Sequence, residues 1–404
     1  MPLYLFLLII FHTNIQQVNG EMTTIQLPIP GRHQWPDRDG YCGSNSIQMN
    51  MLYHGAWISQ KIVRLAVDLG NCTAGGVGDE ILHNNIECAL TQLKVRYDSW
   101  KYKTEPRPQY KNYLIWVKQH LAQYHPVVMF IFCKGDSHGS HGGEKGYGYY
   151  DHIEPIIGIT SNHSLEVGSS DLSIYYPDDQ LIHHSDWDQK YYIRPFATMY
   201  DTPPLDGNCA HVTPIGGGPN EAYPCIPEQV DYGYALLGRI DPLQVLLPVH
   251  VQVNTWKEPD IDEGEKPILI YATITMELLV KNKKYLLLRY DDIQNIPTDS
   301  SFSTDDKYDF KHEFVYDDDG NDDGTKIWKD PNGIQSDTSA NYFCVELCPR
   351  GSVGEWGVGK GRFVQKVPSS KSSLKSKIMG RCTNVPPRII RKKYGASYEV
   401  RVMI

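Results

Sequence analysis

Cys42 lies in the segment Gly40-Tyr41-Cys42-Gly43-Ser44, and apolar residues at helical spacing follow it. This spacing predicts a helix that begins at or near Cys42. Backbone N–H groups in the first turn of a helix have no partner within the helix, and with the helix dipole they favour a thiolate over a thiol. The flanking glycines allow a turn that other residues resist. We therefore expect a cysteine nucleophile at a helix start; the alternative is that Cys42 forms half of a disulfide.

A nucleophilic thiol requires a base, and His152 is the best candidate. It lies at the start of a strand-like run within residues 149–159. An imidazole changes protonation near neutral pH, so it can take the proton of a thiol and return it to a leaving group. Together Cys42 and His152 predict covalent catalysis by a thiol.

The first residues are typical of a secreted protein. Leu3–Phe11 is an apolar run of the length of a signal-peptide core, and we expect cleavage after Gly20. No later stretch is apolar over the roughly 18 residues that a membrane span requires. Glycosylation signals at Asn71 and Asn162 agree with an extracellular glycoprotein.

The cysteine count supports the same interpretation of Cys42. The chain has nine cysteines, and an odd number in an oxidising compartment leaves one thiol outside the disulfides. The residues around Cys42 make it the best choice for that thiol. The other eight could form up to four disulfides, with Cys72/Cys88 and Cys209/Cys225 as plausible pairs.

The charge is distributed unevenly along the chain. The net charge is −9, but residues 291–337 are strongly acidic, whereas from Lys360 onward twelve Lys and Arg face a single Glu. A basic tail of this kind is most often solvated, although it could bind polyanions or the acidic part of its own chain. We expect neither a nucleic-acid nor a membrane partner.

Helical patterns come first and strand patterns later. Helical spacing recurs after Cys42, over Trp57–Leu69, from Ile81 to Leu93 with Asp79 as a cap, and over Tyr110–Tyr124. Strand-like runs then cover residues 126–133, 149–159, 172–176 and 191–199. This order predicts an α+β fold in which helices pack on an antiparallel sheet.

A break at residues 202–207 precedes further strand-like runs at 245–253, 267–280 and 285–290, which predict a smaller all-β domain. The predicted organisation is a signal peptide (1–20), an α+β domain (21–202), a β-rich accessory domain (203–300), and an acidic, then basic, partly irregular region (301–404).

Two segments carry the resemblance to a known family. Asp39-Gly40-Tyr41-Cys42-Gly43, with Ser44 and Gln48 following, resembles the nucleophile segment of the bacteriocin-leader-processing (double-glycine) cysteine peptidases. Asp151-His152 and the strand that ends at Gly158-Ile159 resemble the family's base strand. The resemblance covers about residues 25–200 and implies a papain-like fold.

The resemblance also implies a complete catalytic site. It assigns Cys42 as nucleophile and His152 as base, with Asp178 orienting the imidazole and Asp179 as its reserve. It assigns Gln34 as a donor to the oxyanion, together with the backbone N–H of Cys42. Gln34 precedes Cys42 by eight positions instead of the family's usual six, and Tyr41 replaces the usual acidic residue before the cysteine.

Two other motifs are weaker. Asp136, His138 and His141 lie in a glycine-rich loop and could join His152 in a metal site, but a fourth zinc ligand is not evident. Asp319–Gly324, with Asp330 at the twelfth position, mimics a calcium loop without paired helices around it. We expect no metal and no cofactor, and leave calcium at Asp319 open.

The main hypothesis is a secreted cysteine peptidase or amidase that cleaves a peptide or amide bond through an acyl-enzyme, with a peptide or protein as substrate. The β-rich domain would then bind substrate or a partner. The alternative hypothesis is a secreted binding or matrix protein with a catalytically inactive peptidase-like domain, which the displaced Gln34 and the replacement at Tyr41 favour.

Overall fold

The computed structural model describes residues 22–35, 40–69, 81, 85–100, 104–106, 109–131, 152–184, 190–199, 233–241, 244–261, 263–298, 302, 307–317, 323–349, 356–358, 389–394 and 397–402. The expected signal peptide, the histidine-rich loop and most of the basic tail lie outside these residues. Within them, no helix is both long and apolar enough to cross a membrane.

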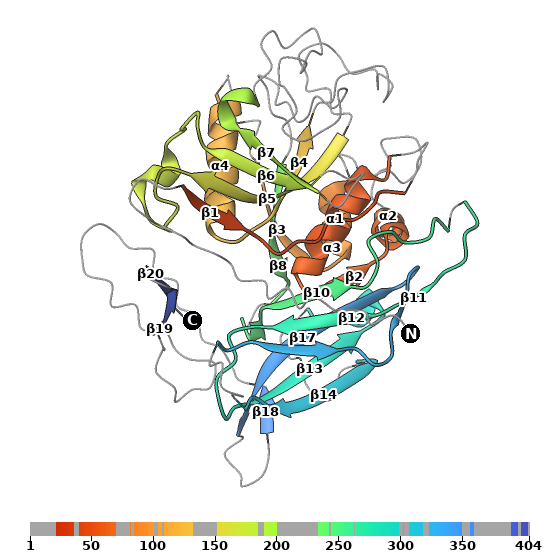
Figure 1. Ribbon diagram of the computed structural model, residues 1–404. Helices are drawn as coiled ribbons and strands as arrows, with labels where there is room; N and C mark the ends of the chain where they lie inside the picture. Colours follow the sequence, from red (N-terminus) through yellow and green to blue (C-terminus); the bar gives the residue numbers. More distant parts are fainter. Residues whose placement is uncertain are drawn as a thin grey trace, which may run out of the picture.

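The α-helices of the described residues all lie in the first third of the chain: α1 (Cys42–Tyr53), α2 (Gln60–Leu69), α3 (Ile86–Gln92) and α4 (Tyr110–Ala122). As predicted, a helix begins at Cys42. Eleven of the twelve residues of α1 are buried, because Ile47 and Met51 pack in one hydrophobic cluster while Met49 packs in another. The helix that carries Cys42 is therefore enclosed on two sides (Figure 1).

An antiparallel sheet packs against these helices, with strand order β3-β8-β4-β5-β6-β7 and β1 added to β5. Its strands are β1 (Thr23–Gln26), β3 (Val95–Ser99), β4 (Val127–Ile131), β5 (His152–Ser161), β6 (Gln180–His184), β7 (Tyr191–Pro195) and β8 (Gly233–Arg239). Helices on an antiparallel sheet make this an α+β protein, as the sequence predicts. β5, which begins at His152, lies in the middle of the sheet.

Two sequence predictions about this sheet are wrong. Residues 172–176 do not form a strand: Ser170–Ser173 is a 3₁₀ turn, in which Ser169 Oγ accepts from the backbone N–H of Asp171 at 3.2 Å. Such side-chain bonds to the backbone compete with strand pairing. The boundary at residue 202 is also wrong, because β8 pairs with β3 and β4 of the first sheet.

The described residues after 244 form mainly strands, and these strands continue beyond residue 300, where the predicted β-rich domain ends. Their sheets are β10-β12-β15, β11-β16 and β14-β13-β17-β18, with β2 and β9 added to β17. The strands are β2 (Ala56–Ile58), β9 (Leu246–Leu247), β10 (Val249–Val253), β11 (Leu269–Ile270), β12 (Ala272–Met276), β13 (Lys284–Tyr290), β14 (Phe310–Val315), β15 (Lys326–Lys329), β16 (Ile334–Gln335), β17 (Ser339–Pro349) and β18 (Trp356–Val358); a separate hairpin joins β19 (Ile389–Tyr394) and β20 (Ser397–Val402). The accessory domain therefore does not end at residue 300, and we call the part built on β9–β18 the β unit.

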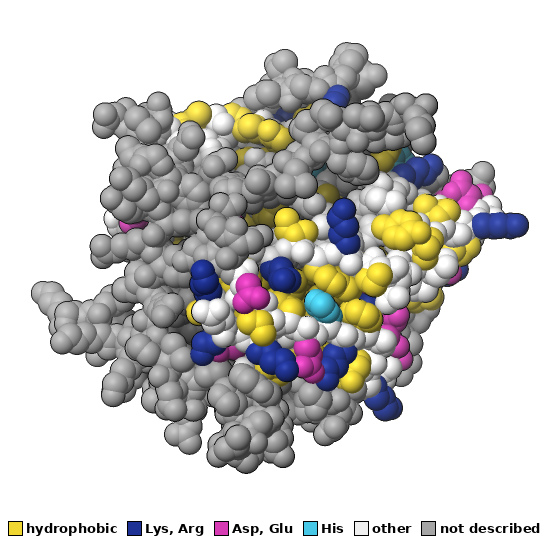
Figure 2. All heavy atoms as spheres, turned by 60° about the horizontal axis from the view of Figure 1, so that its bottom comes forward, with side chains coloured by type: hydrophobic (Ala, Val, Ile, Leu, Met, Phe, Trp, Pro, Cys, Tyr) yellow, Lys and Arg dark blue, Asp and Glu magenta, His cyan; other side chains and the backbone are white. Residues whose placement is uncertain are grey.

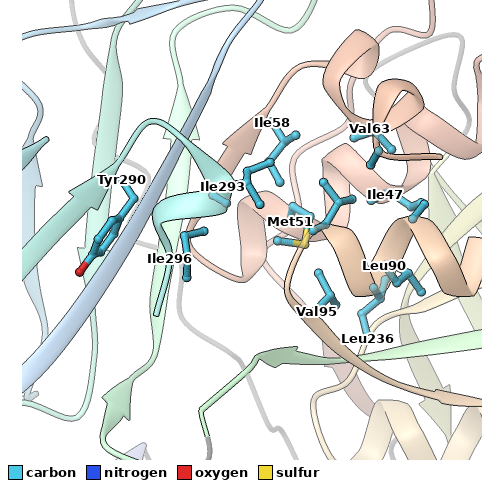
Figure 3. Close-up of a cluster of buried hydrophobic side chains, with 14 of the residues drawn as sticks. Ile47, Met51, Ile58, Val63, Leu90, Val95, Leu236, Tyr290, Ile293 and Ile296 are labelled. Carbon is cyan, nitrogen blue, oxygen red and sulfur yellow. The ribbon is translucent and has the colours of Figure 1, made fainter. Parts of the chain in front are cut away.

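The β unit and the helical part are joined through the core. β2, which the helical pattern over Trp57–Leu69 had assigned to a helix, pairs with β17. Met51 of α1 and Ile58 of β2 belong to one buried cluster with Ile293 and Ile296 from the β unit, as Figure 3 shows. A shared apolar core of this kind couples the two parts in folding.

The face at the bottom of Figure 1 belongs mainly to the β unit. Figure 2 shows basic and acidic side chains interspersed there with apolar ones. Glu313 of β14 illustrates this, since its carboxylate lies 2.7 Å from Lys284 Nζ and 2.8 Å from Lys311 Nζ. Charges of opposite sign thus compensate one another locally on this face.

His54, directly after α1, predicts instability in acid. Burial, followed by the nearby His250, His125 and Arg239, lowers the pKa of His54 to about 3. A histidine with a lowered pKa contributes stability above its unfolded pKa of 6.5, and this contribution is lost as the pH falls. Between pH 7 and pH 5 the loss should be about 2 kcal/mol. Urea denaturation of His54→Gln should show a weaker dependence on pH. His312→Gln is the control, because His312 is only partly buried and burial lowers its pKa by less; equal slopes for the two variants would contradict the prediction.

Candidate active site

Cys42 is the first residue of α1. Gly40, two residues earlier, has φ of 74°, a conformation that favours glycine. Tyr41, the residue before the helix, makes no side-chain hydrogen bond to the first turn. The Cys42 thiol therefore lies beside the first-turn N–H groups, at the positive end of the helix dipole. The side chain is 6% exposed and is not disulfide-bonded, whereas Cys88 is. The disulfide interpretation of Cys42 is therefore excluded.

The cysteine count itself needs a correction. Cys344 of β17 is also buried and outside any disulfide. The remaining cysteines can therefore form at most three disulfides instead of four. Cys42 differs from Cys344 in its position, because only Cys42 lies at the start of a helix.

The first turn of α1 packs on the first residues of β5. Ser46 Oγ donates to the backbone O of Ile153 at 3.0 Å. A Cβ added to Gly43 would lie 3.0 Å from Ile153 Cδ1 and 2.8 Å from Ile81 Cβ, so the glycine permits this close approach. Gly43 follows Cys42 and Ile153 follows His152, and the two candidate residues thus come from neighbouring backbones. The imidazole of His152 lies outside the described side chains.

Gln34 lies against the same helix turn. The ring of Trp35 is 5.0 Å from that of Tyr41, and Asn45 Nδ2 donates to the backbone O of Arg32 at 3.2 Å. Residues on both sides of Gln34 thus contact residues next to or near Cys42. The eight positions between Gln34 and Cys42 along the chain therefore do not keep the two segments apart in the fold.

The side chain of Gln34 has an unusual environment. It is 4% exposed, and its Oε1 has no hydrogen-bond partner among the described residues. Buried polar atoms without partners are rare in folded proteins. The two ends of an amide are nearly equal in shape, so rotation of the group would present Nε2 at the same position. The amide is thus available to a ligand that needs a hydrogen-bond donor.

Asp178 and Asp179 lie at the wrong end of β5. Asp178 accepts from Asn162 Nδ2 at 3.1 Å, and Asp179 accepts from Ser161 Oγ at 2.5 Å. Ser161 ends the strand that His152 begins, and ten residues of strand span about 30 Å. The structure does not bring either carboxylate to His152, which corrects the predicted role of Asp178. The predicted role was wrong because residues 172–176 do not form the strand that pairs with β5. The strand that does so is β6, which begins after both aspartates.

A buried cluster of titratable side chains on β5, β6 and β7 was not predicted. Glu154 Oε2 of β5 lies 2.6 Å from His183 Nδ1 of β6, and both side chains are 3% exposed. Arg194 of β7 is buried on the same side, and burial lowers its pKa to about 10 although Glu154 opposes this. Glu154 is two residues from His152 along β5. The doublet His183-His184 within an apolar strand was the signal in the sequence.

Most residues of the two weaker motifs lie outside the described part of the chain. Asp136, His138 and His141 lie outside the described residues, as does Asp319. Asp330 is described, and its Oδ2 accepts from Arg289 Nη1 at 2.6 Å and from Tyr342 OH at 2.5 Å. The carboxylate of Asp330 is thus engaged by a cation and a phenol. Among the described residues, no three His, Cys, Asp or Glu side chains are grouped as a metal site would require.

Comparisons with known proteins assign no family. The sequence matches no protein-family model, no curated protein and no solved structure. Function must therefore be argued from the site itself.

Proposed function

We propose that this protein is a secreted thiol hydrolase, a cysteine peptidase or amidase with a papain-like arrangement of helix and sheet. The observation that carries the proposal is the Ser46–Ile153 hydrogen bond of 3.0 Å, which holds the helix start bearing Cys42 against the strand start bearing His152. A thiol at a helix start next to a histidine is the arrangement that lowers a cysteine pKa and creates a nucleophile.

The reaction follows from these positions. His152 takes the proton of Cys42, and the thiolate attacks the carbonyl carbon of an amide. The backbone N–H of Cys42 and the Gln34 amide stabilise the negative charge that forms on the carbonyl oxygen. His152 then gives its proton to the leaving amine, and an acyl-enzyme remains. Water, deprotonated by His152, releases the acid and restores the thiol.

A second candidate is a catalytically inactive protein that keeps the same framework and binds its ligand. The position of Asp178 favours it, because the carboxylate predicted to orient His152 hydrogen-bonds to Asn162 at 3.1 Å, beyond the far end of β5. A histidine without an orienting carboxylate loses catalytic efficiency. Acylation of Cys42 by a small ester such as p-nitrophenyl acetate distinguishes the two candidate functions. A thiol hydrolase should be acylated rapidly, whereas an inactive binding protein should not.

Gln34→Ala should lower the rate of acylation by p-nitrophenyl acetate about 100- to 1,000-fold, the usual effect of removing one oxyanion donor. The released nitrophenolate measures this rate. Alkylation of Cys42 by iodoacetamide forms no oxyanion and serves as the control, which should change less than about twofold. An equal loss in both reactions would mean that Gln34 only supports the structure.

A further inference from the structure

A loop of the β unit contacts the segment that carries Gln34. The loop, residues 255–258, follows β10. The backbone O of Trp256 accepts from the backbone N–H of His33 at 2.9 Å, and their rings are 4.9 Å apart. The backbone O of Thr255 accepts from Arg32 Nη1. The β unit therefore supports the residues directly before Gln34.

Glu258 ends this loop and enters the interior of the helical part. It is 0% exposed. Its Oε1 accepts from the backbone N–H of Gln60 at 2.8 Å, and its Oε2 accepts from Gln48 Nε2 at 3.0 Å. Both donors come from the helical part, Gln60 from the first residue of α2 and Gln48 from α1. One carboxylate of the β unit thus joins the start of α2 to the middle of α1.

The side chain of Gln60 carries this connection to Gln34. Gln60 Nε2 donates to the backbone O of His33 at 2.9 Å, and Gln60 Oε1 accepts from the backbone N–H of Trp35 at 3.1 Å. One amide therefore bridges the two residues that flank Gln34. It fixes the backbone on both sides of the candidate donor and leaves the Gln34 side chain itself unengaged.

Arg32 completes the cluster and balances its charge. Arg32 Nε donates to Gln48 Oε1 at 3.3 Å, and its guanidinium lies 4.7 Å from the centre of the Trp57 ring. Arg32 is 1% exposed, and its attraction to Glu258 offsets part of the cost of burying both charges. A buried pair of opposite charges with these hydrogen bonds holds a single geometry.

We propose that Glu258 is a positioning residue of the active site, supplied by the β unit, and that it acts through Gln60 to hold Gln34 beside the backbone N–H of Cys42. The β unit is then an integral part of the hydrolase, and its predicted role as a separate substrate-binding domain is not needed. This inference rests on the proposed function.

Glutamate is required here for a chemical reason. Burial raises the pKa of Glu258 to about 7. Above that pH the group is a carboxylate, and its two oxygens provide an acceptor for each of the two donors, from Gln60 and Gln48. A glutamine at position 258 offers one oxygen and places an NH₂ group against the other donor. Rotating the Gln48 amide does not resolve this conflict, because its Nε2 would leave the backbone O of Ile58, to which it donates at 2.8 Å, and would face Arg32.

The test compares Glu258→Gln with Glu263→Gln, an exposed glutamate that also lies between β10 and β11, in the full chain. Glu258→Gln should lower acylation by p-nitrophenyl acetate at least tenfold and leave iodoacetamide alkylation of Cys42 within about twofold of wild type. Glu263→Gln should change neither. In the double variant with Gln34→Ala, the loss should not exceed that of Gln34→Ala alone, because both changes remove the same interaction. Full acylation in a folded Glu258→Gln variant, or additive losses, would overturn the inference.

Two further measurements separate this inference from the proposed function. If wild type and Cys42→Ala are acylated equally slowly, the proposed function fails. Amide hydrogen exchange then tests the positioning by Glu258 alone. The Trp35 N–H should exchange at least tenfold faster in Glu258→Gln than in wild type, and an unchanged exchange rate would refute the positioning role. If Glu258→Gln does not fold, Gln60→Ala breaks the same bridge without affecting the buried charges, and the same outcomes apply.

Discussion

Cys42→Ala should reduce the hydrolysis of p-nitrophenyl acetate to the background rate of the solution, a loss of about a thousandfold or more, because no other described thiol lies at a helix start. His152→Ala should cause a loss of similar size. Without the imidazole, the thiol keeps its proton at neutral pH and the leaving group receives none. Initial rates of nitrophenolate release measure both effects.

Alkylation of Cys42 by iodoacetamide near pH 6 measures the reactivity of the thiol separately from the later steps of hydrolysis. An ordinary thiol with a pKa of about 8.5 is only about 0.3% ionised at that pH. A pKa near 6 would ionise about half of it, and the weaker nucleophilicity of a low-pKa thiolate leaves a net gain of about tenfold. His152→Ala should remove this gain.

Cys344→Ser is the matched control, because Cys344 is the other buried cysteine shown to lie outside a disulfide. It should alter neither hydrolysis nor the alkylation of Cys42. Alkylation of Cys42 that is slow and independent of His152 would contradict the hydrolase and favour the inactive binding protein.

Asp179→Ala should destabilise the fold by about 3–5 kcal/mol, the usual cost of removing one partner of a buried ion pair. Asp179 Oδ2 lies 2.8 Å from Lys118 Nζ of α4, and the two side chains are 0% and 1% exposed. Without the carboxylate, the ammonium of Lys118 keeps the backbone O of Ile174 at 2.5 Å and the ring of Tyr176, whose centre is 4.8 Å away, but no group of opposite charge among these contacts. The midpoint of urea denaturation measures the loss.

The neighbouring Asp178→Ala provides the contrast. The Asp178 side chain is 53% exposed, and exposed ionic contacts contribute at most about 1 kcal/mol. Asp178→Ala should also leave the alkylation of Cys42 unchanged. A slower alkylation would restore the predicted role of Asp178 as the group that orients His152.

Local signals account for much of what the sequence predicted. The glycine before Cys42 and the helical spacing after it depend on residues within a few positions of one another, and α1 begins at Cys42. The strand-like run over residues 149–159 is predicted for the same reason, because β-branched Ile153, Ile156, Ile157 and Ile159 lie within a few positions of one another, and β5 covers His152–Ser161. Where backbone preference and side-chain pattern agree within one segment, the sequence is sufficient.

The assignment of Asp178 failed because it depended on which strand pairs with β5. Leu172 is buried, and an apolar residue in a turn looks the same in sequence as one in a strand. Strand pairing is a non-local interaction, and here it selected residues 180–184. The assignment of β8 to the first sheet, across the predicted domain boundary, is non-local in the same way.

The sequence by itself determined the helix that begins at the candidate nucleophile and the strand that carries the candidate base, because each depends on short-range preferences. The tertiary structure alone decided what surrounds them. Glu258 is 198 residues from Gln60 along the chain, and no periodicity or motif in the sequence links the two. Only burial brings them together, since a carboxylate removed from water must find donors wherever the fold supplies them.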